Sequence, residues 1–273
     1  MPVTGDAVAQ AADLFRVTVE SARSLSDGDD TGDTFSCRRG RERCFLKVVS
    51  RDWSGNLAAY RAELAEVRWI ADRLTGDIRV YLPLKSTAGE LCEPVPAGGE
   101  HCVAWLTADA AGVARDRAYV STPEGRHLLG RIVARLHGVA REYPLWRRER
   151  PADPGRRVGS AGPASGAGYG DARDWRSLVE AMLHMLGDDP GVANRVERLA
   201  AELERLPVDR EGYGLVHSDL SLGNTVWSAE ASTGIDFEGF YSWYAFNLAL
   251  NTTVTGYQAE EINCALNTWE PVA

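Results

Sequence analysis

The densest group of side chains with catalytic potential lies between residues 214 and 240. A short apolar run leads into His217 and Asp219, and Asn224 follows five residues after Asp219. Asp236 comes after a second apolar stretch. Carboxylate and carboxamide oxygens are the ligands that Mg²⁺ prefers, and Mg²⁺ combines few protein ligands with phosphate oxygens. The spacing therefore indicates an oxygen-rich metal and phosphate site; polar caps on the turns of a β-hairpin are the alternative.

Two motifs in this segment resemble those of a known enzyme family. Residues 217–224 read H-S-D-L-S-L-G-N, and residues 235–237 read I-D-F. They resemble the catalytic loop H-G-D-x-x-x-x-N and the metal motif I-D-F/W of the aminoglycoside phosphotransferase and choline kinase family, which shares the protein-kinase fold. Protein kinases carry the related patterns H-R-D-x-x-x-x-N and D-F-G. The resemblance spans roughly residues 30 to 250, and Glu238 after I-D-F favours the small-molecule branch.

The resemblance implies a fold, two cofactors and a set of roles. The expected fold is α+β, protein-kinase-like, with a sheet-rich nucleotide-binding lobe over residues 1–108 and a mainly helical lobe over 109–273. ATP and Mg²⁺ are the expected cofactors. Asp219 would orient the acceptor hydroxyl and take its proton late, whereas Asn224 and Asp236 would hold the metal. His217 would brace the loop without a chemical role.

The family also requires a strand lysine that reaches the ATP phosphates and a helix glutamate that holds it. Lys47 lies in the apolar run 44–49, where burying a charged side chain is costly unless the charge is paired or used. The chain has only two lysines, so 28 of its 30 basic residues are arginines. Glu63 is the first candidate partner because it shares a helical stripe with apolar residues, and Glu66 is the second. A solvent-facing lysine in an edge strand is the alternative for Lys47.

Two further positions are expected to contact the nucleotide. The strand that contains Trp105 and Thr107 should be the hinge whose backbone holds adenine, an assignment that rests on position alone. The segment 26–33, rich in Gly and Asp, lies where the family has its phosphate loop, although it does not read G-x-G-x-x-G.

The elements that must position these residues follow from periodicity and turn residues. A hairpin, a long helix and a second pair of strands are predicted first, followed by a helical region that is broken at Pro190-Gly191. A flexible loop over about 147–172 is predicted from its Gly, Pro, Ser and Arg content. The predicted strands cover 34–39, 43–50, 79–86 and 99–108, and the predicted helices cover 56–74, 124–142, 174–186 and 192–206.

Composition narrows the class of protein. The chain has 273 residues, of which 44% are hydrophobic, and its net charge is −9. An acidic chain is a poor general binder of nucleic acids and anionic membranes, so neither is expected as a partner. Five scattered cysteines argue against a zinc site and against a disulfide framework. No signal peptide or apolar span is evident, so a cytoplasmic location is expected.

Two departures from the family pattern bear on the acceptor. Only 34 residues follow the I-D-F-E-G motif, whereas family members continue with more helices that complete the acceptor pocket. Asn247 stands where the family commonly has Asp before Leu-Ala. An open acceptor site, one completed by a partner or a second copy, and a different site are therefore all open. The aromatic residues over 240–246 favour ordinary core packing over a stacking platform for the acceptor.

Three functions compete at this point. The first is an ATP- and Mg²⁺-dependent kinase that phosphorylates a hydroxyl of a small molecule, with a cationic antibiotic mildly favoured by the acidic charge. The second is a Ser/Thr kinase that acts on a peptide in natural-product biosynthesis. The third is a nucleotide-binding pseudokinase, against which the presence of all four key polar positions counts. The chain has no GxxxxGK[ST] motif, which excludes a P-loop NTPase.

Overall fold

The structure is a computed structural model in which part of the chain is described. The described residues are 3–21, 32–50, 57–97, 100–114, 119, 122–144, 174–186, 190–217, 220, 224–237 and 239–246. The predicted loop over 147–172, most of the Gly- and Asp-rich segment 26–33, and Asp219 lie outside the described residues. The chain divides into two compact units, one formed by residues 1–114 with 225–236 and the other by residues 115–224 with 237–273.

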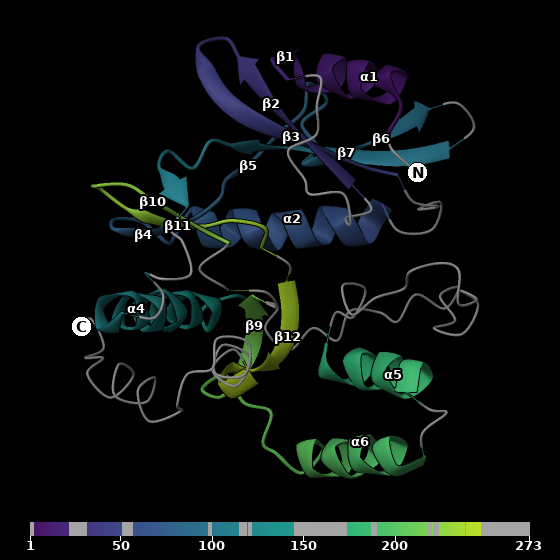
Figure 1. The fold of residues 1–273 in the computed structure, drawn as a ribbon, viewed down its shortest axis with the longest axis vertical. Helices are drawn as coiled ribbons and strands as arrows, with labels where there is room; N and C mark the ends of the chain where they lie inside the picture. The colour runs from purple at the N-terminus through teal and green to yellow at the C-terminus, as the bar shows by residue number, and fades with distance from the viewer. Residues whose placement is uncertain are drawn as a thin grey trace. The chain divides into compact units, whose positions relative to one another are not determined.

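The first unit contains a six-stranded antiparallel sheet (Figure 1). Its path runs β1-β2-β3-β7-β5, and β6 also pairs with β7. The bounds are β1 Thr18–Val19, β2 Gly32–Arg39, β3 Glu42–Ser50, β5 Pro83–Leu84, β6 Cys92–Ala97 and β7 Glu100–Ala108. The predicted hairpin joined at Gly40 is confirmed, because β2 and β3 pair in a register that closes at Arg39 and Glu42.

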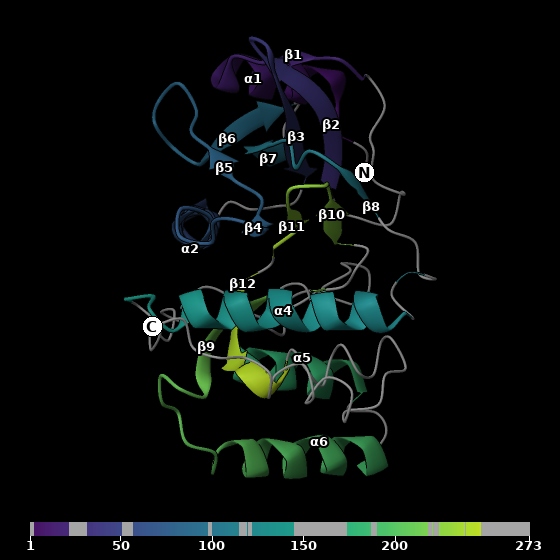
Figure 2. The ribbon, with the colours of Figure 1, turned by 90° about the vertical axis from the view of Figure 1, so that its left-hand side faces the viewer.

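Two helices cover opposite faces of this sheet, α1 (Gly5–Phe15) and α2 (Leu57–Ala71), as both ribbon views show (Figure 2). Side chains alternate between the faces of a strand, so neighbouring residues of β3 enter different cores. Leu46 and Val48 pack with Phe15 of α1, whereas Val49 packs with Leu64 of α2. Thr4 caps α1 because its hydroxyl accepts a hydrogen bond from the Ala7 amide at 3.4 Å.

A second, four-stranded sheet completes the first unit. It has the order β4-β11-β10-β8, with β4 at Ile78–Val80, β8 at Val113–Ala114, β10 at Thr225–Trp227 and β11 at Ser232–Gly234. β11 runs parallel to β4, and the other pairs are antiparallel. The amide of Tyr81 extends the parallel pairing by donating to the Gly234 carbonyl at 2.8 Å. This sheet brings residues 225–236 into the unit that contains the N-terminal hairpin.

The second unit combines helices with a two-stranded antiparallel sheet. The helices are α4 (Pro123–Ala140), α5 (Trp175–Leu186) and α6 (Pro190–Leu203), and the strands are β9 (Tyr213–His217) and β12 (Gly239–Trp243). Thr122 is the N-cap of α4, and its hydroxyl accepts a hydrogen bond from the Gly125 amide at 3.1 Å. Pro123 suits the first helical position, because a backbone N–H there would have no partner within the helix. Every residue of β9 is buried.

Two local predictions need correction. The strand predicted over 79–86 is two short strands, β4 and β5, which belong to different sheets. The break predicted at Pro190-Gly191 is the beginning of α6, because proline is tolerated in the first turn of a helix. The α+β fold class is confirmed. Within the described ranges, no helix is both long and apolar enough to cross a membrane.

Candidate active site

Lys47 occupies the centre of the large sheet. β3 lies between β2 and β7, and Lys47 is opposite Thr34 on one side and Trp105 on the other. Because β3 is an interior strand, the edge-strand alternative for Lys47 does not hold. Its side chain is 23% exposed, so much of the aliphatic stem is covered while the ammonium can still meet solvent.

Asp236 lies against Lys47 although 189 residues separate the two in sequence. The Lys47 Nζ donates to the Asp236 Oδ1 at 3.2 Å. Asp236 follows β11 by two residues and has a φ of 52°, in the left-handed region. Asp and Asn enter this region more readily than other side chains, so the backbone and the charge both favour aspartate here. The parallel pairing of β11 with β4 carries Asp236 into the unit that holds Lys47.

An aromatic pair flanks the same ammonium group. The Lys47 Nζ is 5.7 Å from the centre of the Trp105 ring, within the range of a cation–π interaction. The ring of Tyr60 on α2 is 5.6 Å from the Trp105 ring at an angle of 31°. The lysine is therefore held between a carboxylate and an indole, and the indole is in turn supported by the helix.

The two glutamates predicted as lysine partners are both buried on α2. Glu63 is 7% exposed and Glu66 is 3% exposed. Glu63 lies one turn after Tyr60, which contacts Trp105, so the helix brings the predicted partner to the buried side that faces the sheet. The choice between Glu63 and Glu66 stays a prediction.

Thr107 and Phe45 lie further along the same face of the sheet. They are opposite each other in the β3–β7 register, and the Thr107 hydroxyl donates to the Phe45 carbonyl at 3.5 Å. Phe45 and Lys47 are two residues apart, so their side chains project from the same face. The sequence reasoning missed Phe45, although the two-residue alternation of the strand predicts its position. The hinge role of the strand stays a prediction.

The remaining predicted residues are placed less completely. Asn224 is half-buried and directly precedes β10. It is the last residue of the segment 115–224, which belongs to the second unit. Asp219 lies outside the described residues. His217 is fully buried, and its ring lies 4.7 Å from the ring of Phe237; its bracing role stays a prediction.

The chemistry of the Lys47–Asp236 pair fits a metal–nucleotide ligand. An ammonium group suits phosphate oxygens, and a carboxylate suits a divalent metal ion. The Asp236 side chain is 56% exposed, so its ion pair contributes at most about 1 kcal/mol to stability and can be exchanged for ligand contacts. Among the described residues, no group of three His, Cys, Asp or Glu side chains could hold a metal ion.

Comparison with known proteins shows the family to which this chain belongs. The model of the phosphotransferase enzyme family matches residues 25–245, which include Lys47, Asp219 and Asp236. The chain belongs to the phosphotransferase enzyme family. A phosphotransferase relative is amicoumacin kinase from Bacillus subtilis (strain 168), which is 24% identical over 250 residues. The match covers 89% of this chain, and the chain spans 66% of the length of that kinase.

Solved phosphotransferase structures share the fold. An amicoumacin kinase in complex with AMP-PNP, Ca²⁺ and Ami superposes with a TM-score of 0.70 at 17% identity, over 97% of this chain and 78% of that chain. A microcompartment-associated aminopropanol kinase gives 0.59 at 20% identity, over 97% and 81%. Spectinomycin phosphotransferase in complex with ADP and spectinomycin gives 0.55 at 13% identity, over 100% and 82%. The predicted family and the kinase-like fold are confirmed.

Proposed function

We propose that this chain is an ATP- and Mg²⁺-dependent kinase that transfers the γ-phosphate to a hydroxyl of a small molecule. The observation that carries the proposal is the contact between the Lys47 ammonium and the Asp236 carboxylate at 3.2 Å. In the absence of ligand, each group neutralises the charge that the other would offer to a metal–phosphate complex. When a nucleotide binds, the ammonium can neutralise phosphate charge and the carboxylate can bind the metal ion. Positioning and charge neutralisation are the main contributions of a protein to phosphoryl transfer.

The proposed roles follow from the positions of the residues. Lys47 binds phosphate oxygens, with Glu63 holding its rotamer and Trp105 covering the ammonium on one side. Asp236 and Asn224 hold the metal, which when bound supplies charge neutralisation to the phosphates. Asp219 orients the acceptor hydroxyl and receives its proton. Thr107 lies beside the nucleotide on the same face as Lys47, and Phe45 provides an apolar surface next to it.

The acceptor is proposed to be a hydroxylated small molecule that carries an amine. The relatives include kinases named for amicoumacin and aminopropanol and a phosphotransferase named for spectinomycin. The net charge of −9 favours the approach of a cationic acceptor. A partner or a second copy that completes the acceptor site stays a prediction.

Thermal unfolding with Mg²⁺ alone, with ATP alone and with both tests the nucleotide site. A ligand at about one hundred times its dissociation constant stabilises a protein by roughly 2.7 kcal/mol, so the midpoint should rise clearly with both ligands. Asp236→Asn should lose the shift, because it removes the carboxylate while asparagine still accepts the left-handed backbone. Asp72→Asn is the matched control, because Asp72 is an exposed carboxylate of the same unit that pairs with Arg68 at 3.1 Å.

Lys47→Met and Lys85→Met form a second matched pair. They replace the chain's only two lysines, and Lys85 is exposed at the surface of the same unit. Only Lys47→Met should weaken nucleotide binding.

Phosphoryl transfer to a panel of aminated alcohols and antibiotics then tests Asp219→Ala, which should abolish transfer and keep the thermal shift. Full turnover in both Asp219→Ala and Asp236→Asn would contradict the proposed site.

A further inference from the structure

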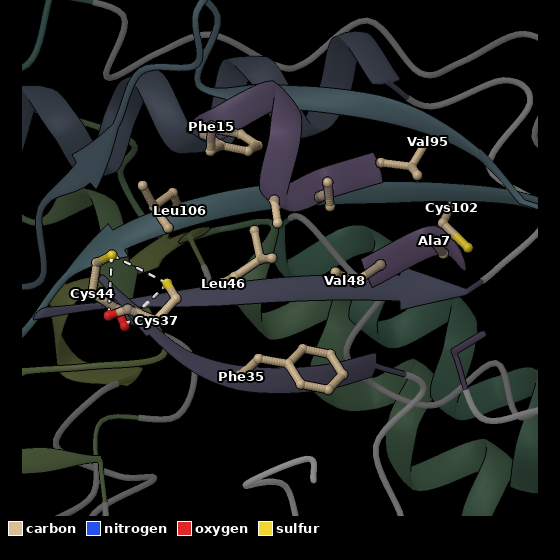
Figure 3. Packing of buried hydrophobic residues seen from close by; sticks show 13 residues of the cluster. Ala7, Phe15, Phe35, Cys37, Cys44, Leu46, Val48, Val95, Cys102 and Leu106 are labelled. Atoms are coloured by element: carbon tan, nitrogen blue, oxygen red, sulfur yellow. Dashed lines mark hydrogen bonds between the residues drawn. The ribbon is translucent and has the colours of Figure 1, made fainter. Parts of the chain in front are cut away.

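Two cysteine thiols that the phosphotransferase site does not use lie against each other in the large sheet. Cys37 of β2 is directly opposite Cys44 of β3, and their Sγ atoms are 3.1 Å apart. Figure 3 shows both side chains turned toward each other, with each thiol also near the other residue's carbonyl oxygen. Both residues belong to the core beneath α1, with 0% and 1% of their surfaces exposed.

The backbone geometry suits a covalent bond between these thiols. Opposed residues of an antiparallel pair have Cα atoms about 4.5 to 5.5 Å apart, and disulfides span Cα separations of about 4.4 to 6.8 Å. Directly opposed residues thus fall within the Cα range of disulfides, and the two Sγ atoms would close from 3.1 Å to a bond length of about 2.05 Å. A shared metal ion fits less well, because two sulfurs each about 2.3 Å from a tetrahedral zinc lie roughly 3.8 Å apart. The described residues also contain no third metal ligand beside them.

We propose that Cys37 and Cys44 are a site of reversible oxidation, at which a peroxide converts the two thiols into an intramolecular disulfide. One thiolate attacks a peroxide oxygen and becomes a sulfenic acid as hydroxide leaves. The second thiol then attacks the sulfenic sulfur, the S–S bond forms, and water leaves. Two thiols and one hydrogen peroxide thus give one disulfide and two waters, and a dithiol reductant reverses the change.

The contact between the thiols favours the first step of the oxidation. The hydrogen bond lowers the pKa of one thiol of the pair and raises that of the other, because it stabilises one thiolate against one remaining proton. Whichever sulfur attacks the peroxide, the resolving thiol is already 3.1 Å away. Reversible thiol oxidation requires such a contact, since the resolving thiol must react before a second peroxide does.

The oxidant reaches the pair from the edge of the sheet. β1, which pairs with Cys37 through Val19, has only two residues. Short edge strands open locally at little cost, and hydrogen peroxide is close to water in size. The bond would join the two strands of the hairpin that carries Lys47, three residues beyond Cys44 and on the opposite face. Oxidation therefore stiffens the strand that presents Lys47 without occupying its face.

The test exposes the full chain to a small molar excess of hydrogen peroxide, followed by alkylation in denaturant and peptide mass spectrometry. We expect a Cys37–Cys44 disulfide, three remaining thiols of the five in the chain, recovery with dithiothreitol, and a higher unfolding midpoint in the oxidised form. The readout is independent of any kinase activity, so it stands or falls separately from the proposed function.

Three variants make the result specific. Cys37→Ser and Cys44→Ser should each abolish the disulfide, because each removes the resolving partner of the other thiol. Cys92→Ala is the matched control, because Cys92 is a fully buried cysteine of the same sheet with Arg61 rather than a thiol beside it. It should form the disulfide as the wild type does. Unchanged thiols in the wild type, or a disulfide that involves another cysteine, would overturn the proposal.

Discussion

At the scale of single residues, Asp236 is constrained twice. Its carboxylate contacts Lys47, and its φ of 52° lies in a region that costs most L-residues about 1 to 2 kcal/mol. Among the described residues, Arg16 is the other non-glycine residue with positive φ, and it ends α1 as a left-handed cap. Asp236 lies two residues beyond the end of β11, where its carboxylate meets the Lys47 ammonium.

A second residue constraint lies in the other unit, where Tyr244 covers Gly214. A Cβ atom on Gly214 would lie 2.4 Å from the Tyr244 hydroxyl oxygen and 3.1 Å from its ring carbon. Tyr244 also stacks on His137 with ring centres 4.4 Å apart. Its hydroxyl is buried with no hydrogen-bond partner among the described residues. Burial raises the pKa of Tyr244 for the same reason, since the phenolate would lose its hydration.

Gly214→Ala should therefore destabilise the protein by about 1 to 3 kcal/mol, because the added methyl group overpacks a buried contact. Urea unfolding measures the change. Gly138→Ala is the control: no atom lies within 4 Å of a Cβ at this α4 position, so the free energy of unfolding should rise by about 0.5 to 1 kcal/mol. Adding Tyr244→Phe to Gly214→Ala should recover part of the loss. Equal effects of the two glycine substitutions would contradict this packing.

At the scale of elements, the β10–β11 hairpin determines where Asp236 lies. The hairpin is held by β4 on one side and by β8 on the other. Gly112, just before β8, has a φ of 148°, and a Cβ there would lie 2.2 Å from the carbonyl oxygen of Trp227. The β8–β10 contact thus requires a residue without a side chain at this point.

Gly112→Ala should cost more stability than Gly89→Ala, with a difference of about 1 to 3 kcal/mol from the backbone clash. Gly89 also has positive φ, 88°, but no atom lies within 4 Å of its Cβ position, so it reports the conformational cost alone. Only Gly112→Ala should also weaken Mg²⁺-dependent ATP binding, because β10 leads through β11 to Asp236. Titration calorimetry measures the binding. Equal ATP affinities in the two variants would show that the β8–β10 contact does not influence the position of Asp236.

Local patterns predicted the elements that depend on local contacts. The strand predicted over 43–50 is β3, and the helices predicted over 56–74 and 124–142 are α2 and α4 with ends shifted by a few residues. The three-residue strands β10 and β11 are too short for periodicity, and the parallel partner of β11 lies about 150 residues away. The I-D-F motif pointed to Asp236, whereas Lys47 was predicted separately, as one of only two lysines and from its place in an apolar run. Their contact, and the placement of Trp105 beside Lys47, depend on strand register, which the sequence does not display.

At the scale of the whole molecule, a buried thiol and a buried phenol make the free energy of unfolding decrease at alkaline pH. Burial raises the pKa of Cys92 from its usual value of 9.0 to about 12. The pKa of Tyr244 is raised as well, also mainly by burial. Between the unfolded and folded pKa values, the unfolded chain has released protons that the folded protein still holds. The stability that these groups contribute is complete below pH 9 and is lost as pH rises.

The free energy of unfolding should therefore fall between pH 9 and pH 12, with a slope that Cys92 steepens by up to about 1.4 kcal/mol per pH unit. Chemical unfolding at a series of pH values, under reducing conditions, gives the profile. Cys92→Ala should flatten it in this window, while the two profiles run parallel below pH 8. Parallel profiles up to pH 12 would show that the thiol at position 92 titrates alike in the folded and unfolded chains.

The four-stranded sheet has a consequence for the order of events during synthesis. Two of its strands, β4 and β8, are complete once residue 114 has left the ribosome, but β10 and β11 end at residues 227 and 234. Translation proceeds at about 5 to 20 residues per second, so the interval of 120 residues lasts roughly 6 to 24 seconds. During that time β4 and β8 have no partner strand, because β4 pairs with β11 and β8 pairs with β10. The small sheet, and with it the meeting of the lysine and the aspartate, therefore waits until the chain has been made beyond residue 234.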